Sequence, residues 1–455
     1  MQARTTGLDD QVADQVEAFV QASVRDGTGR AARMLAATPE IVGYGFAPAA
    51  VLGDVTRVRE AIERDPGLVT RPDARSDWTP LHLVCGSRWH RLDPARAGGL
   101  LAVARLLVDA GADLAATAGG HWTPLRCAVA GAANPALVRL LLDRGAVPDD
   151  HDLYLACFGD DAHESLRLLL DRAPNVAETT ALAAPISTGD IEGVRLLLAA
   201  GADPNRLPPA DLYGGRYADD PPWPAVYAAV RSGCSVELVR LLLEHGADPD
   251  APGPDGQVPH QLAVRQGAAE LARLVRRYGA GPGATEVDLF LAACLQADRP
   301  AAERQRSRGR VHLDQLTDAD RATLYRAAET GNTAAVRLML DLGFPVEARG
   351  GDDGGTPLHA AAYSGGAETV RLLLDRGADI EARDSTWDSP PLVWATVGSG
   401  ERPKHNPDAD WVATVRALLG AGASTEGITL SPDDLKPPSP DVAQLLRTHG
   451  IPDEH

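Results

Sequence analysis

The chain has 455 residues and carries 44 Lys and Arg against 63 Asp and Glu, so its formal net charge at pH 7 is −19. A field of this sign repels phosphate groups, and the composition therefore argues against nucleic acid or an anionic membrane as a partner. The five cysteines are odd in number and scattered, which is typical of reduced thiols and predicts a cytoplasmic protein.

Residues 1–44 predict a helical cap at the start of the chain. The opening stretch MQARTTGLDDQVADQVEAFVQ is amphipathic and acidic, without the basic start and apolar core of a secretory signal. No run of eighteen apolar residues occurs, so no membrane-spanning helix is predicted. The overlapping stretch VEAFVQASVRDGTGRAARMLAATPEI is interpreted as a degenerate helix pair that covers the end of a stack.

A Leu-rich phrase recurs from there to the C-terminus, mostly about every 28 to 34 residues. Copies are VARLLVDAGADL (103–114), LVRLLLDRGAVP (137–148), GVRLLLAAGADP (193–204), LVRLLLEHGADP (238–249) and TVRLLLDRGADI (369–380). A fixed period in this range predicts stacked supersecondary units.

The sequence of one unit predicts its local structure. In residues 369–377 the apolar positions form one broad helix face, and Gly377 follows where a left-handed cap ends a helix at least cost. Ahead of it, Thr356 suits an N-cap and Pro357 suits the first helical turn. Two such short helices cannot bury both faces alone, so each unit requires neighbours on either side.

The stretch GGTPLHAAAYSGGAETVRLLLDRGADIEARD (354–384) resembles the ankyrin repeat, and so do DWTPLHLVC (77–85) and HWTPLRCAV (121–129). The resemblance, to a bacterial multi-repeat ankyrin protein, covers about residues 45–455. It implies an all-α ankyrin-repeat solenoid of stacked helix-turn-helix units with hairpin fingers. The expected organisation is a cap (1–44), a first sub-stack (45–282), a degenerate linking repeat (283–316) and further repeats with a C-terminal cap (317–455).

Three stretches are too long for such a unit: residues 86–99, 205–223 and 398–410. Their Pro, Gly and Asp content predicts loops, which have either drifted without function or shape a binding site. The insertion 205–223 is the best candidate for a site, because the resemblance places it beside the concave groove. It carries Tyr213, Arg216, Tyr217 and Trp223.

No pattern in the sequence predicts catalysis. His82 and His359 occupy the TPLH position, where the resemblance implies a structural hydrogen bond, and Cys85 stands at an Ala site of the first helix. No zinc spacing, nucleophile elbow, phosphate loop or dinucleotide fingerprint occurs. We therefore expect no catalytic residues, no metal and no cofactor, and the sequence favours a role other than that of an enzyme without excluding one.

The resemblance places partner contacts at the finger tips and on the first helices, beyond their small residues. The tryptophans at or near finger tips are Trp78, Trp122 and Trp387. The other expected contacts are Phe158, Tyr213, Arg216, Tyr217, Trp223, Tyr227, Arg231, Arg265, Glu329 and Tyr363.

Three functions stay open at this point. The leading hypothesis is a scaffold that binds another protein through its concave groove and finger tips. An alternative is an enzyme or small-molecule binder with a pocket in the groove under the 205–223 insertion. A further alternative is an acidic inhibitor or immunity protein for a basic partner, whose binding would weaken at high salt.

Overall fold

The computed structural model describes residues 2–25, 29–73, 77–158, 162–207, 223–254, 256–307, 309, 311–401, 406, 408–426, 428, 430 and 437–451. Over these ranges the regular structure is helical, no strand is present, and the fingers contain two isolated β-bridges, Ala118 with Trp122 and Gly350 with Gly355. The predicted all-α stack of helix pairs is confirmed. Within the same ranges no helix has both the length and the apolarity needed to cross a membrane.

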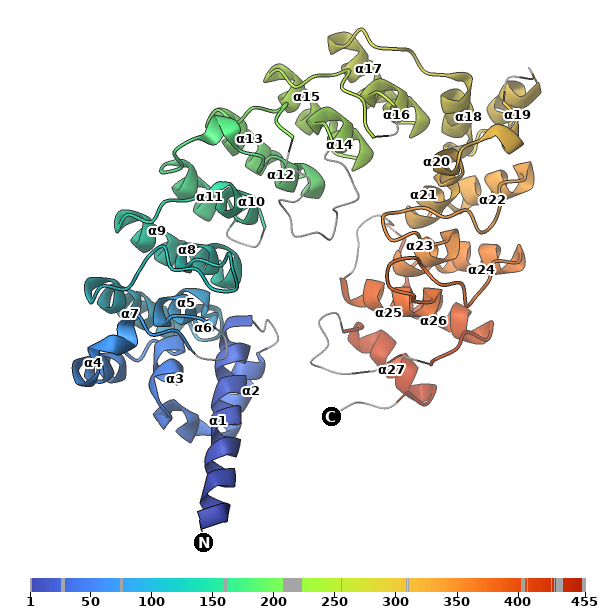
Figure 1. Cartoon of the computed structure of the whole chain (residues 1–455). Helices are drawn as coiled ribbons and strands as arrows, with labels where there is room; N and C mark the ends of the chain where they lie inside the picture. Colours follow the sequence, from blue (N-terminus) through green and yellow to red (C-terminus); the bar gives the residue numbers. More distant parts are fainter. Residues whose placement is uncertain are drawn as a thin grey trace. The chain divides into compact units, whose positions relative to one another are not determined.

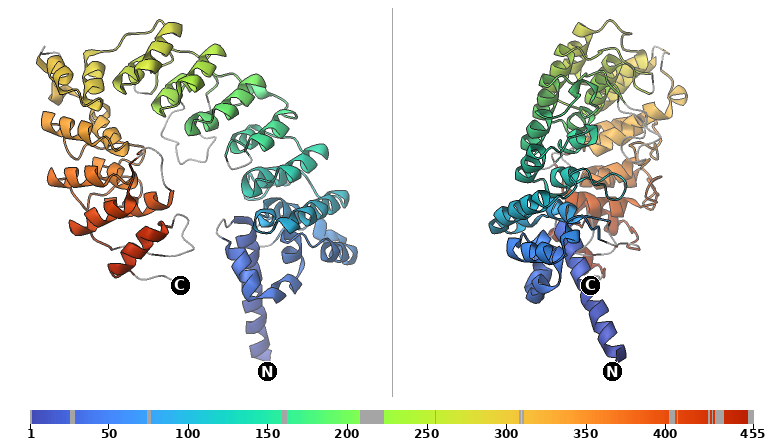
Figure 2. Two further views of the ribbon diagram at one scale, coloured as in Figure 1. Left: turned by 180° about the vertical axis from the view of Figure 1, so that it is seen from behind. Right: turned by 60° about the vertical axis from the view of Figure 1, so that its left-hand side comes forward.

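The chain forms two compact units, Met1–Gly256 and Gln257–His455. Within each unit the helices form two rows, one of first helices and one of second helices (Figures 1 and 2). The expected cap and sub-stack boundaries stay predictions.

In the first unit, α1 packs against α3 and α5, and successive first helices and second helices then pack on one another. Its helices are α1 (Gln2–Arg25), α2 (Arg30–Ala37), α3 (Phe46–Val51), α4 (Val55–Arg64), α5 (Pro80–Gly86), α6 (Trp89–Leu92), α7 (Ala97–Asp109), α8 (Pro124–Arg126), α9 (Pro135–Asp143), α10 (Asp150–Leu155), α11 (Ala162–Leu170), α12 (Ala183–Thr188), α13 (Ile191–Ala199), α14 (Ala225–Arg231) and α15 (Val236–Glu244).

In the second unit the first helices α16, α18, α21, α23 and α25 pack in succession, as do the second helices α22, α24 and α26. Its helices are α16 (Pro259–Arg265), α17 (Ala269–Tyr278), α18 (Glu286–Leu295), α19 (Arg299–Ser307), α20 (Asp318–Arg321), α21 (Thr323–Glu329), α22 (Thr333–Leu342), α23 (Pro357–Tyr363), α24 (Ala367–Asp375), α25 (Pro391–Glu401), α26 (Trp411–Gly420) and α27 (Pro440–Thr448).

The start of α23 shows how local sequence sets a unit. The Thr356 backbone N–H donates to His359 Nδ1 at 3.1 Å, so the ring carries its proton on Nε2, which donates to the Ser389 carbonyl at 2.9 Å. Burial lowers the pKa of His359, which keeps the imidazole neutral. His82 makes the same bond to the Trp122 carbonyl at 3.0 Å. These histidines therefore join a first helix to the next finger.

Helices α23 and α25 approach each other closely at Gly398. A Cβ atom on Gly398 would lie 2.1 Å from the Tyr363 carbonyl oxygen, which already accepts a hydrogen bond from Trp411 Nε1 at 2.9 Å. Gly398→Ala is therefore expected to push the two helices apart and to lower the free energy of unfolding by about 1–3 kcal/mol. Urea unfolding of the full chain measures this change.

The matched control for this substitution is Gly420→Ala, because Gly420 also lies in a helix and a Cβ there meets nothing within 4 Å. Its alanine variant should be as stable as the unmodified chain, or slightly more stable. Equal stability of the two variants would contradict the close approach at Gly398.

Candidate functional site

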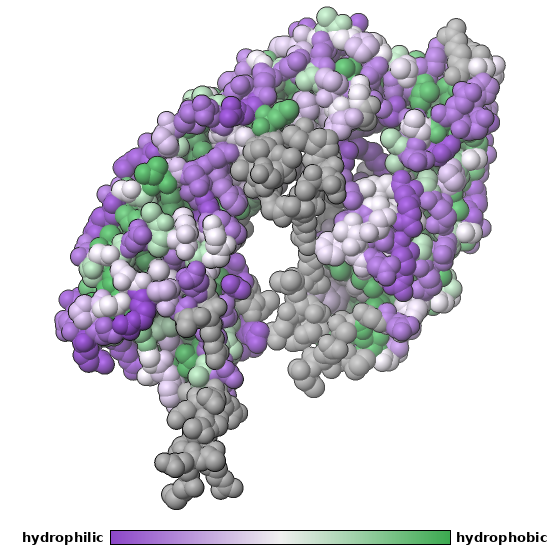
Figure 3. Space-filling view, viewed as in Figure 1, coloured by the Kyte–Doolittle hydropathy of each residue, from purple (hydrophilic) through white to green (hydrophobic). Residues whose placement is uncertain are grey.

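Carboxylates and aromatic rings gather on the first-helix side of the second unit, on α21, α23, α25 and two fingers. The fingers are residues 343–355 and 377–389. We call this surface the acidic–aromatic face. It comprises Glu329, Asp352, Asp353, Tyr363, Trp387, Trp394 and Glu401, whereas the Tyr325 ring behind it is only 8% exposed, covered by Gly350 and Gly351. Figure 3 shows a largely hydrophilic surface over the fingers of this unit.

Hydrogen bonds tie the two fingers to each other. Arg349 Nη2 donates to the Arg383 carbonyl at 2.9 Å, and the Ser385 N–H donates to the Asp353 carbonyl at 3.0 Å. Trp387, 53% exposed, donates from Nε1 to Asp353 Oδ1 at 3.1 Å. The largest exposed ring of this surface is thus held in place before any partner binds, which reduces the entropy cost of binding.

Asp384 organises the tip of the second finger. Its carboxylate is buried and accepts hydrogen bonds from the backbone N–H groups of Trp387 at 2.6 Å and Ser389 at 3.0 Å, and from Trp394 Nε1 at 2.9 Å. Burial opposes ionisation of this group, but the donors outweigh burial and lower its pKa below the ordinary value. Asp384 is therefore a charged structural residue that orients both tryptophans.

Two tyrosines lie among four carboxylates. Tyr363 Oη donates to Glu401 Oε2 at 2.5 Å; burial, and then this bond, raise the pKa of Tyr363. Burial, and then the charge of Glu329, raise the pKa of Tyr325. The charges of Asp353 and Asp352 also act on Tyr325. Both phenols therefore stay neutral, and the potential around them is negative.

Aromatic rings of α23 and α25 contact one another edge to face. Trp394 meets His359 edge-on at 5.2 Å between ring centroids and Tyr363 at 6.0 Å. Two cations lie on the same fingers: Arg349 Nη1 donates to the Gly354 carbonyl at 2.6 Å, and Arg383 Nη1 to the Asp388 carbonyl at 2.8 Å. Rings beside carboxylates form a surface suited to Lys or Arg side chains.

The tryptophans predicted as contacts in the first unit are partly covered. Trp78 packs on His82, with ring centroids 6.0 Å apart, and also against Gly86. Trp122 is half-buried, whereas Phe158 is 39% exposed and meets Tyr154 edge-on at 5.3 Å. Phe158 thus has a larger exposed fraction than either tryptophan.

Near the long insertion, the Arg231 guanidinium carbon lies 3.7 Å from the centroid of the Trp223 ring, a cation–π contact. Tyr227 is only 3% exposed, because its ring lies directly under Gly253 of the next finger. A partner therefore has little access to this tyrosine. Tyr213, Arg216 and Tyr217 lie outside the described residues.

Arg265 lies in an ion cluster between consecutive repeats and is not displayed to solvent. Its Nη2 lies 2.9 Å from Asp288 Oδ1 and its Nη1 lies 2.7 Å from Asp320 Oδ1, with the arginine side chain 13% exposed. Asp288 also forms a capping box with Thr285, and Asp320 forms one with Thr317. Arg265 therefore joins three repeats. Those two Thr-x-x-Asp patterns were the available signal for this structural role.

The sequence-based prediction included Glu329, Tyr363 and Trp387 but missed most of their neighbours. The missed residues are Tyr325, Asp352, Asp353, Trp394 and Glu401. A signal existed for two of them, because GGDDGG forms the finger that precedes the best repeat. The others come from neighbouring repeats, and only packing brings them together.

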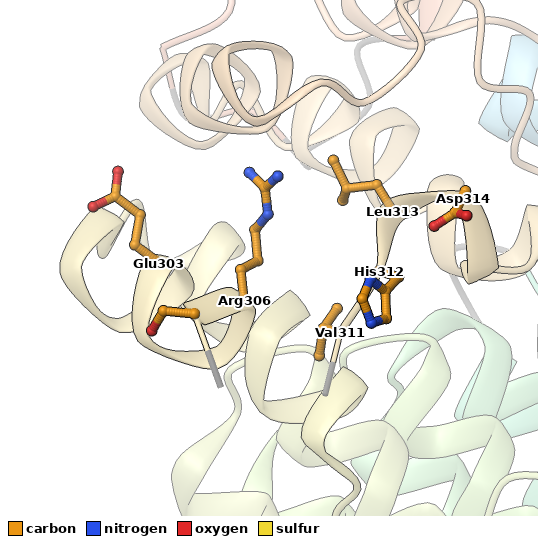
Figure 4. Close-up of a pocket in the computed structure, with 7 residues that line it drawn as sticks. Glu303, Arg306, Val311, His312, Leu313 and Asp314 are labelled. Carbon is orange, nitrogen blue, oxygen red and sulfur yellow. The ribbon is translucent and has the colours of Figure 1, made fainter. Parts of the chain in front are cut away.

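The described cysteines and a polar cavity beside α19 show no catalytic arrangement. All five cysteines are buried free thiols, and burial raises the pKa of Cys127 to about 12, so this thiol is unreactive at neutral pH. A cavity of about 640 Å³ lies beside α19. Figure 4 shows its carboxylates, Glu303 and Asp314, on opposite sides, so the described lining brings no acid pair together.

Comparison with known proteins identifies the repeat. Residues 289–384 match the family model for ankyrin repeats (3 copies), and residues 223–254 match the ankyrin repeat model. No curated protein shows significant similarity to the chain. The sequence-based prediction of an all-α ankyrin-repeat fold is confirmed, since the matched residues span α14–α15 and α18–α24.

Two solved structures match about half of the chain. The human ASB11 ankyrin repeat domain is 23% identical, with a TM-score of 0.25, and the match covers 53% of this chain and 98% of that one. An ankyrin repeat domain from Acinetobacter baumannii AYE is 22% identical, with a TM-score of 0.31, and the match covers 52% and 98%.

Proposed function

We propose that this ankyrin-repeat protein binds a basic segment of a partner protein through the acidic–aromatic face. Ankyrin repeats are generally protein–protein interaction modules, which supports the class of function. The observation that carries the proposal is the grouping of four carboxylates around the two phenols, next to the exposed ring of Trp387. The five free thiols support a cytoplasmic location.

The chemistry of this face favours Arg or Lys side chains. An arginine that stacks on an indole or phenol ring gains a cation–π contact, and a nearby carboxylate then binds its N–H groups in a charged hydrogen bond. The net charge of −19 adds long-range attraction for a basic segment and speeds its association. The scaffold and the acidic inhibitor are both consistent with this surface, and the identity of the partner separates them.

The alternative of a catalytic or small-molecule pocket depends on the insertion 205–223. Its key side chains, Tyr213, Arg216 and Tyr217, lie outside the described residues. The described contacts of Trp223 are those with Arg231 and Tyr227, which pack within their own repeat. These contacts add no support to a pocket.

The proposal predicts charge-selective peptide binding. A fluorescent peptide of alternating Arg, Gly and Ser should bind the full chain, and its Glu-for-Arg counterpart should not. Trp387→Ala and the double variant Glu329→Gln/Asp352→Asn should each weaken binding about tenfold or more, because they remove a ring and two charges from the contact. Fluorescence anisotropy at several salt concentrations measures both effects.

The matched control is Asp375→Asn, which removes one carboxylate from the exposed end of the second helix α24. It should leave peptide affinity unchanged. Equal binding of the Arg and Glu peptides, or full binding by the Trp387→Ala variant, would overturn the proposal.

A further inference from the structure

A second surface of the same unit has the opposite character. A groove of about 770 Å³ separates the second helices α17 and α19, and α18 forms its base. We call it the α17–α19 groove; Val264, Ala272, Leu289, Ala292 and Ala301 line it, with Arg273 and Arg277 at its rim. Figure 1 shows α16 and α17 on one side of α18 and α19 on the other.

The groove exists because α19 lacks the usual leucines. Its sequence is RPAAERQRS, and Ala302 is the residue it buries. In α22 and α24 the corresponding faces bury larger side chains, such as Leu338 and Leu372, and those helices pack directly. Alanine side chains are too short to fill the same space, so the side of α19 that faces α17 leaves part of α18 uncovered.

The base of the groove is apolar and exposed. Leu289 is 41% exposed in the middle of α18, although Phe290 and Leu291 beside it are fully buried. Ala292 also lines the groove. Leu289 and the surrounding alanines form a continuous apolar hollow, and an apolar surface with polar groups at its rim is typical of an interaction site.

The rim of the groove is positively charged. Arg273, Arg276 and Arg277 are exposed on α17, and no carboxylate is among the described residues that line the groove. The acids on α17, α18 and α19 are Glu270 at the start of α17, Glu286 and Asp288 in the first turn of α18, and Glu303 on α19, which lies 3.6 Å from Arg299. A chain of net charge −19 therefore has a local cluster of three arginines beside an apolar hollow.

One buried acceptor in the groove has no donor. Gln305 Oε1 is inaccessible to solvent and makes no hydrogen bond within the described residues. Gln305 lines the groove from α19. Because this oxygen is inaccessible to solvent, a ligand in the groove cannot reach it directly, and it instead marks the imperfect packing of α19 on its neighbours.

We propose that the α17–α19 groove binds an acidic amphipathic helix of a partner protein. Apolar side chains at i, i+3, i+4 and i+7 of such a helix would cover Leu289 and the alanines. They would fill the space that leucines of α19 would otherwise occupy. Its Glu or Asp side chains would then bind Arg273 and Arg277. A basic helix would be repelled, and a nucleic acid would leave the apolar base uncovered. This proposal is independent of the acidic–aromatic face, which selects the opposite charge.

A synthetic peptide tests the proposal. The probe is a fluorescent helical peptide with Leu at i, i+3, i+4 and i+7 and Glu at the flanking positions, and its counterpart carries Lys in place of Glu. We expect the Glu peptide to bind the full chain, and we expect the affinity of the Lys peptide to be lower by about tenfold or more. Leu289→Asp and Arg273→Glu/Arg277→Glu should each reduce binding of the Glu peptide about tenfold or more.

Two controls separate this effect from misfolding and from general electrostatics. Arg371→Glu changes the equivalent exposed position of α24, away from the groove, and should leave binding unchanged. Circular dichroism should show unchanged helicity in Leu289→Asp, since this side chain is already 41% exposed.

Several outcomes would overturn the proposal. They are equal binding of the two peptides, unchanged binding by Leu289→Asp, and equal binding of a Glu peptide without leucine. If the full chain instead forms an oligomer that Leu289→Asp dissociates, the groove binds a second copy of the chain and not a partner helix.

Discussion

Replacing Arg265 with methionine is expected to lower the free energy of unfolding of the second unit by about 3–5 kcal/mol, because it leaves two buried carboxylates without their cation. Asp288 and Asp320 are 2% and 9% exposed, and the guanidinium lies within 2.9 Å of both. The methionine side chain preserves most of the packing, so the loss of stability measures the effect of removing the positive charge. Arg265 thus holds α16, α18 and α20 together and is unsuited to partner binding.

Hydrogen exchange of the full chain, read at the amides of α16, α18 and α20, measures this loss where it occurs. The triple variant Arg265→Met/Asp288→Asn/Asp320→Asn should recover part of the stability, since the buried charges are then gone. Arg273→Met, at an exposed position of α17, is the matched control. A loss below about 1 kcal/mol in Arg265→Met would show that the pair behaves as a surface salt bridge.

The second large effect is expected for Arg126→Met in the first unit, and it should depend on pH. Arg126 is 4% exposed; its Nε lies 3.1 Å from Asp152 Oδ1 and its Nη2 lies 2.6 Å from Asp149 Oδ2. Burial, and then the charge of Asp149, raise the pKa of Asp152 to about 6, while Arg126 opposes that rise. Without the arginine the pKa of Asp152 rises further, because the carboxylate has lost its cation and keeps only the hydrogen bond from the Asp149 N–H, at 3.0 Å.

The sign of the pH dependence follows from linkage. A carboxyl group whose pKa is higher in the folded state stabilises the fold at low pH, and that contribution is lost as pH rises through the folded-state pKa. The free energy of unfolding of Arg126→Met should therefore be lower than that of the unmodified chain by about 3–5 kcal/mol at pH 8, where Asp152 is charged. The difference should be clearly smaller at pH 5, where Asp152 binds a proton. Urea unfolding at the two pH values measures the difference.

Two further variants check this interpretation. Measured in an Asp152→Asn background, the loss of stability caused by Arg126→Met should depend little on pH between 5 and 8, since the titrating group is gone. Arg144→Met removes a more exposed arginine that pairs with Asp109 at 2.5 Å and should cost less than about 1 kcal/mol. A larger loss at pH 5 than at pH 8 in Arg126→Met would contradict the assignment to Asp152.

The site was only partly predictable from sequence, because burial depends on neighbouring repeats. Tyr227 and Arg265 occupy the first-helix positions that the resemblance assigns to partner contact. Gly253 of the next finger covers the first, and aspartates of the next two repeats bind the second. The backbone at Gly253 covers the Tyr227 ring, and Asp288 and Asp320 hold the Arg265 side chain inside the stack.

The sequence by itself determined the helix pairs of this protein and their stacking. The Thr–Pro starts, the leucine faces and the Gly ends act within a few residues of one another, and their period requires neighbours to bury the apolar faces. Only the tertiary structure decided which surfaces remain available. Glu329, Tyr363 and Glu401 meet because three first helices pack side by side, and Leu289 is exposed because α19 is too small to cover it. Both surfaces arise from contacts between repeats, which no single repeat encodes.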